Sequence, residues 1–110
     1  MLIFFGRVQD IENNSYETGR AEAYFVPEGV AVDLYSNTLH SVPCLMDIRG
    51  FKCAVISLKG TGAALKSEHC EHELLHSRNR WIIAHAEAEE YVNKETQIGL
   101  IGENIEVFTY

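Results

Sequence analysis

Apolar and polar residues alternate in short runs along the first half of the chain. Residues 2–11 are rich in β-branched and aromatic types and end at Asn13-Asn14-Ser15, which is a turn signal. Residues 20–26 form a second run of this kind, which ends at Pro27-Glu28-Gly29. Residues 30–35 alternate with a period of two, so one face of this segment is apolar. We therefore expect two strands before residue 27 and a hairpin that joins residues 20–26 to residues 30–35.

The stretch PCLMDIRGFKCAVISL predicts a second hairpin. With Arg49-Gly50 as its two-residue turn, Asp47 lies opposite Lys52 on one face, and the apolar residues of both arms share the other face. That apolar face consists of Cys44, Met46, Ile48, Phe51, Cys53 and Val55. In this register Cys44 and Cys53 are diagonal neighbours roughly 7 Å apart, farther than a disulfide normally spans, so we expect both to be buried thiols.

A change of pattern at residue 63 predicts a long helix. Residues 63–95 are rich in Ala, Leu, Glu, Lys and Arg and contain neither Pro nor Gly, with Asn79 as a candidate break. A helical wheel places Leu74, Trp81, Ile82 and Val92 on its core side. This stripe should pack against the apolar face of the hairpin around Phe51.

The chain ends in another strand signal. Residues 98–110 contain Gly102-Glu103-Asn104 between two apolar runs, which predicts a hairpin or a bent terminal strand. The order of elements predicts an α+β fold, a mainly antiparallel sheet of about five to six strands packed on one long helix in the C-terminal half.

Composition narrows the class of protein. At 110 residues the chain should form a single domain, residues 1–110, and its 46% of apolar residues is typical of a globular protein. Its formal charge of -7 disfavours nucleic acid and anionic membranes as partners and favours a basic protein partner. Charges at Arg7 and Asp10 interrupt the apolar N-terminus too early for a signal peptide or membrane span, and three unpaired cysteines fit a reducing compartment. We therefore expect a cytoplasmic protein.

The pentapeptide HELLH, residues 72–76, is the strongest candidate for chemistry. On a helix, His72 and His76 could share a zinc ion, and Glu73 could act as general base on the bound water. The pentapeptide resembles the motif of zinc proteases, but the resemblance covers five residues and no third ligand follows at the spacing of those families. His69, His72 and His76 could form a surface metal site at i, i+3 and i+7, on the helix side away from the core stripe. The interpretation we favour is a solvated polar face of the helix, so we expect no catalytic residue and no cofactor here, with zinc as the alternative.

Two further patterns suggest chemistry. Gly60-Thr61-Gly62, with Lys59 and Lys66 nearby, could bind an anion through exposed amides, although the third glycine of a dinucleotide-binding loop is missing. Cys70 could pair with a histidine as a nucleophile, but the wheel buries Cys70 and turns the nearby histidines outward.

Three functions fit these observations. The leading one is a small acidic cytoplasmic binding or accessory protein, of the inhibitor, immunity or adaptor type, which acts through its surface. The first alternative is a small zinc-dependent hydrolase that uses HELLH, and the second is a small-ligand-binding domain with a pocket between sheet and helix. Accordingly, a protein partner, a small-molecule ligand and a homo-oligomer all stay open, as does enzymatic activity.

Overall fold

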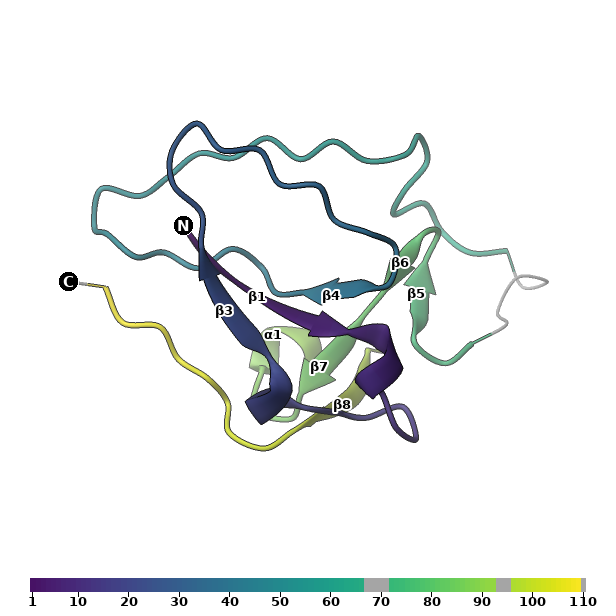
Figure 1. Ribbon diagram of the computed structural model, residues 1–110. Coiled ribbons are helices and arrows are strands. Elements are labelled where there is room, and N and C mark those ends of the chain that lie inside the picture. The colour runs from purple at the N-terminus through teal and green to yellow at the C-terminus, as the bar shows by residue number, and fades with distance from the viewer. Residues whose placement is uncertain (67–71, 93–95, 110) are drawn as a thin grey trace. The chain divides into compact units, whose positions relative to one another are not determined.

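Short strands dominate the architecture (Figure 1). The computed structural model describes residues 1–66, 72–92 and 96–109. Within these ranges the strands form three sheets of two or three strands, and one α-helix, α1 (Glu89–Val92), is present. The predicted fold class, α+β with one long helix, is therefore wrong.

The contacts divide the chain into two units. The first unit contains Met1–Ile11, Glu17–Cys53 and Gly102–Tyr110, and the second contains Glu12–Tyr16 and Ala54–Ile101. Neither unit is a continuous stretch of sequence, because the chain leaves and re-enters each of them.

A three-stranded antiparallel sheet forms the centre of the first unit (Figure 1). Its middle strand is β1 (Leu2–Arg7), between β3 (Glu22–Phe25) and β4 (Thr38–His40). The β-branched and aromatic residues of β1 suit a central strand, and Ile3 and Val26 are buried in the core of this unit. Both strands predicted before residue 27 are confirmed.

The predicted hairpin between residues 20–26 and 30–35 is wrong. The turn at Pro27 exists, since Val30 N donates to Pro27 O and Gly29 has a φ of 81°. The strand before it, however, pairs with β1, and residues 30–35 belong to no strand and have exposed side chains. Local periodicity identified β3 but not its partner.

The first crossing into the second unit is a tight turn. Asn13 and Asn14 have φ values of 51° and 58°, and Glu12 and Ser15 exchange backbone hydrogen bonds of 2.9 Å. Asn tolerates this left-handed conformation better than most residues, so the predicted turn is confirmed. Two 3-10 turns flank it in sequence, η1 (Val8–Asp10) and η2 (Thr18–Arg20).

The second unit contains most of a three-stranded sheet and a hairpin. Strand β8 (Gln97–Ile101) lies between β2 (Tyr16–Glu17) and β7 (Ile83–His85), and its pairing with β7 is parallel. Strands β5 (Leu75–Ser77) and β6 (Arg80–Trp81) form an antiparallel pair. Buried residues of this unit include Leu74, 1% exposed, and Ala84, 4% exposed.

These elements replace the helix predicted over residues 63–95, so that prediction is wrong. Asn79 takes a φ of 58°, and the chain reverses there between β5 and β6 instead of continuing as a helix. Of the predicted core stripe, Leu74 is buried, but Trp81 and Val92 are 47% and 45% exposed. The hydrogen bonds of β7 go to β8, a partner that a helical wheel cannot reveal.

The predicted hairpin over residues 44–55 is also wrong, and the turn that forms is centred on residues 48–49, one residue before the predicted Arg49-Gly50 turn. Gly50 N donates to Asp47 O at 2.9 Å, and Gly50 has a φ of 76°. Beyond the turn no strand follows, and Phe51 is 41% exposed, so it does not pack against a helix.

The cysteines depart from the expected burial as well. Cys44 forms an isolated bridge with Leu2 of β1 and is half-buried, whereas Cys53 is exposed. Cys70 lies outside the described residues.

The predicted terminal strand exists as β8, which ends at Ile101 and is followed by Gly102 with a φ of 107°. Residues 103–109 form no further strand. In the part of the chain that the structure describes, no helix is long and apolar enough to cross a membrane.

Candidate functional site

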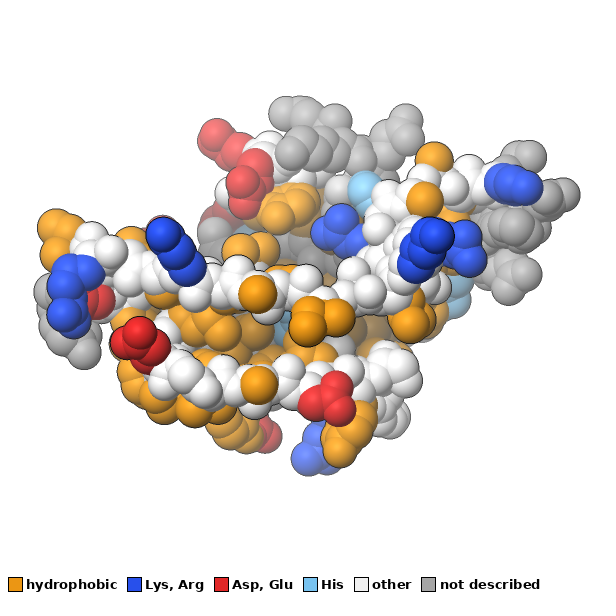
Figure 2. All heavy atoms as spheres, turned by 90° about the horizontal axis from the view of Figure 1, so that it is seen from above, with side chains coloured by type: hydrophobic (Ala, Val, Ile, Leu, Met, Phe, Trp, Pro, Cys, Tyr) orange, Lys and Arg blue, Asp and Glu red, His pale blue; other side chains and the backbone are white. Residues whose placement is uncertain are grey.

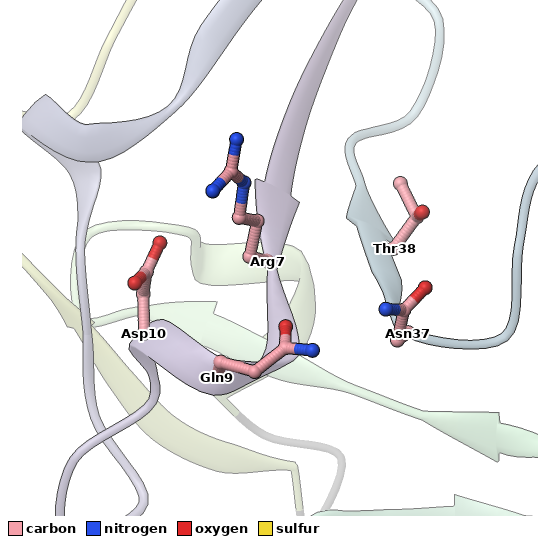
Figure 3. A pocket seen from close by; sticks show the side chains of 5 residues that line it. All are labelled: Arg7, Gln9, Asp10, Asn37 and Thr38. Atoms are coloured by element: carbon pink, nitrogen blue, oxygen red, sulfur yellow. The ribbon is translucent and has the colours of Figure 1, made fainter.

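A polar pocket lies at one end of the sheet of the first unit (Figure 3). It encloses about 500 Å³ and is partly open to solvent. Arg7 comes from the end of β1, and Gln9 and Asp10 come from η1. Thr38 is the first residue of β4, and Asn37 lies in the turn directly before it.

Backbone pairing fixes the two walls of this pocket. Arg7 lies opposite Thr38 in the antiparallel register of β1 and β4, and Val8 N donates to Asn37 O at 3.1 Å. The chain then tightens into η1, where Ile11 N donates to Val8 O at 3.1 Å. The side chains of Gln9 and Asp10 are consequently held beside a strand that follows them by almost thirty residues.

The charges in the pocket are incompletely compensated. The Arg7 guanidinium forms no ion pair with any carboxylate of the described residues, so its donors are available to a ligand. Asp10 lies 4.0 Å from Arg20, which is also 3.3 Å from Glu17, so one arginine serves two carboxylates. All three side chains are partly exposed, and water screens these pairs.

The lining therefore offers both kinds of hydrogen-bonding group. A guanidinium supplies donors only, a carboxylate supplies acceptors only, and the amides of Gln9 and Asn37 and the hydroxyl of Thr38 supply both. Such a set can hold a small molecule by hydrogen bonds and one ion pair. Sequence reasoning missed all five residues, because they become neighbours only through the pairing of β1 with β4.

The HELLH segment has a different geometry from the one its motif predicts. The chain turns at Glu73 and Leu74 and then extends as β5, so no helix aligns His72 with His76. His76 is exposed on β5. The physical reason for expecting two imidazoles side by side is thus absent.

His72 and Glu73 have structural contacts within the second unit. The His72 ring stacks on Trp81, with ring centroids 4.5 Å apart and an interplanar angle of 14°. His72 Nδ1 accepts a hydrogen bond from Leu74 N at 3.1 Å, and a Glu73 carboxylate oxygen accepts one from Asn14 Nδ2. These contacts connect the turn before β5 to β6 and to the Asn13-Asn14 turn.

The metal site predicted at His69, His72 and His76 stays a prediction. His69 lies outside the described residues. Among residues 1–66, 72–92 and 96–109, no three His, Cys, Asp or Glu side chains lie close enough together to hold a metal ion.

One comparison with known proteins identifies a family. A family model described as a domain of unknown function (DUF4867) matches residues 1–105, so the chain belongs to this family. No curated protein and no solved structure matches the chain.

Proposed function

We propose that this member of the DUF4867 family is a binding domain whose ligand is a small polar organic anion, held in the pocket beside Arg7. The observation that carries the proposal is the placement of a guanidinium without a carboxylate partner among hydrogen-bonding side chains of η1 and β4. The small-ligand function expected from the sequence is retained. Its location changes, because the long helix that should have covered the pocket does not exist.

The chemistry of the lining supports a carboxylate or phosphate ligand that also carries hydroxyl or amide groups. A guanidinium binds such an anion through two parallel hydrogen bonds, which fix the orientation of the ligand as well as attract it. Asp10 would accept a hydrogen bond from a ligand hydroxyl or ammonium group. A volume of about 500 Å³ lies within the range of small-molecule sites.

The test is an NMR titration of the labelled protein with a panel of hydroxy acids, amino acids and sugar acids. We expect saturable amide shifts at residues 7–10 and 37–38 with at least one of these compounds. A hydrogen bond to a charged group contributes about 1.5–3 kcal/mol, so Arg7→Gln should weaken binding by about tenfold or more. Lys52→Gln is the matched control, because it removes one exposed positive charge of the same unit away from the pocket lining.

The proposal fails if no compound in the panel shifts these amides. It also fails if Arg7→Gln and Lys52→Gln weaken binding equally, because the interaction would then depend on net charge alone.

A second candidate, binding of a protein through the surface, rests on exposed apolar side chains. In the first unit Tyr35 is 74% exposed, Val42 69% and Ile48 88%. Exposed apolar side chains that form one patch are typical of interaction sites, and this candidate requires these three side chains to do so. With a net charge of -7, this surface favours a partner that carries both basic and apolar groups.

Two measurements test this second candidate. Sedimentation over a wide concentration range detects self-association of the chain. Titration with a basic amphipathic peptide tests for binding of another protein. Ile48→Ser with Tyr35→Ser should weaken either interaction. A protein that stays monomeric and ignores the peptide would remove the support for this candidate.

A further inference from the structure

The second unit carries a basic cluster that the proposed pocket does not use. We propose that the Gly60-Thr61-Gly62 loop and the turn of the β5–β6 hairpin form a separate anion site, which takes the phosphate group of a small molecule. The site consists of the side chains of Arg78 and Arg80, held against the loop, with Lys59 next to it in sequence. The loop backbone serves as support, because the amides of residues 61–63 already donate to backbone carbonyls.

Backbone pairing brings the two segments together. Gly62 N donates to Arg78 O at 2.9 Å, and Arg78 N donates to Ala63 O at 3.0 Å. The side chain of Asn79, at the tip of the hairpin, donates to Thr61 Oγ1 at 3.4 Å. The loop and the hairpin turn therefore hold a defined position relative to each other, although about fifteen residues separate them in sequence.

Both arginine side chains lie against the glycines of the loop. A Cβ atom at Gly60 would be 3.4 Å from Arg78 Nη1, and one at Gly62 would be 3.8 Å from Arg80 Nη1. The Arg78 guanidinium therefore lies beside Gly60, and the Arg80 guanidinium lies beside Gly62, two residues farther along the loop. Gly60 and Gly62 have φ values of 86° and 84°, which a residue with a Cβ adopts only with strain, so both glycines suit this arrangement.

The arginines have no counter-charge within the described part of the chain. Neither Arg78 nor Arg80 forms an ion pair there, although the protein contains sixteen acidic residues. Figure 2 shows several Lys and Arg side chains close together on the side where Figure 1 places β5 and β6. An oxyanion that contacted both guanidinium groups would gain two charge-assisted contacts.

The observations favour a small phosphorylated molecule over a nucleic acid. A net charge of -7 repels a long polyanion, whereas a single phosphate group responds mainly to the charges next to it. Because both arginines are exposed, water and salt screen the site, and we expect modest, salt-sensitive binding.

The experiment is an NMR titration of the labelled chain with glycerol phosphate and with inorganic phosphate, at low and at physiological salt. We expect saturable shifts at the amides of residues 59–62 and 78–80, smaller at the higher salt. The variant Arg78→Gln with Arg80→Gln should raise the dissociation constant by about tenfold or more. The control, Arg49→Gln with Lys52→Gln, changes the net charge equally in the first unit and should leave the constant within about twofold.

Three outcomes would overturn the proposal. Equal weakening in both double variants would show a response to net charge. Shifts confined to residues 7–10 and 37–38 would assign the anion to the other pocket, whose own test uses Arg7→Gln. Tighter binding of a single-stranded oligonucleotide to residues 59–62 and 78–80 would show a surface for polyanions.

The variant Arg78→Lys with Arg80→Lys is the control for misfolding. It keeps both charges and should retain weaker, still saturable binding.

Discussion

The side chain of Arg49 folds back onto Asp47, two residues earlier, in the exposed turn before Phe51. Arg49 donates to both carboxylate oxygens, and its backbone N donates to Asp47 Oδ1 at 2.9 Å. The hydrogen bonds from the Arg49 side chain, followed by the one from its backbone, lower the pKa of Asp47 from 3.8 to about 2. The sequence predicted a turn one residue later, at Arg49-Gly50, and in that register Lys52 was the expected partner of Asp47.

We expect an NMR titration to give a midpoint near 2 for the Asp47 carboxyl group. Since the folded pKa is depressed, this contact stabilises the turn fully above about pH 4 and the stabilisation is lost as the pH falls through about 2. Arg49→Gln removes the charged donor and should move the midpoint back towards 3.8. Identical midpoints in the two proteins would show that Arg49 does not cause the shift.

Glu73 gives a second test at a single side chain. It is exposed, and its hydrogen bond from Asn14 can persist in Glu73→Gln, because the amide oxygen still accepts. We expect the free energy of unfolding, measured in urea, to change by less than about 0.5 kcal/mol. Glu73→Ala, which removes the acceptor, should be the less stable of the two variants.

The same substitution separates a structural Glu73 from a catalytic one. In a zinc hydrolase, loss of the general base would reduce turnover by about 10² to 10⁴ while the metal stayed bound. Metal analysis of the untagged protein, with His72→Ala and His76→Ala as the comparison, therefore accompanies the stability measurement. One zinc per chain with hydrolysis sensitive to Glu73→Gln would establish the hydrolase.

Strands and turns can be predicted from the sequence where the signal lies in the residues that form them. They cannot be predicted where the structure depends on pairing with a distant segment. The β-branched run of β1 and the turn residues Asn13 and Asn14 act on their own backbone, and these predictions are confirmed. Residues 63–95 have the composition of a helix, but helix propensity amounts to less than about 1 kcal/mol per residue and yields to strand pairing. The pairing of β7 with β8 joins segments whose relation no local period encodes.

Asn79 distinguishes the hairpin from the predicted helix. Its φ of 58° is left-handed, so Asn79→Ala should destabilise the protein by about 1–2 kcal/mol relative to Asn79→Gly. Both variants lose the contact with Thr61, and the difference between them therefore isolates the backbone term. In a helix the order would be reversed, because Ala is favoured over Gly by about 1 kcal/mol. Urea denaturation of the two variants decides between these orders.

The packing between elements can be tested by two truncations. Leu74 is 1% exposed, so Leu74→Ala should lower the free energy of unfolding by about 2–5 kcal/mol. Phe51 was expected in the core, but it is 41% exposed, and Phe51→Ala should cost less than about 2 kcal/mol. A larger loss for Phe51 than for Leu74 would restore the packing predicted from the sequence.

The pocket illustrates why function was harder to predict than strands. Arg7 and Thr38 are 31 positions apart, and neither lies in a motif. Only the register of the complete β1–β4 pair makes them neighbours. HELLH, by contrast, was conspicuous in the sequence, yet its meaning depended on a helix that the tertiary pairing replaced with β5.

The connectivity of the two units makes a prediction for the molecule as a whole. The chain crosses between them four times. Folding of either unit therefore fixes the ends of chain segments that belong to the other unit. We therefore expect one unfolding transition.

The single tryptophan, Trp81, reports on the second unit, and Ile3→Val destabilises the core of the first by about 0.5–1.5 kcal/mol. In urea, Trp81 fluorescence and far-UV circular dichroism should give coincident midpoints, and Ile3→Val should shift both equally. A Trp81 transition that does not respond to Ile3→Val would show that the units unfold independently.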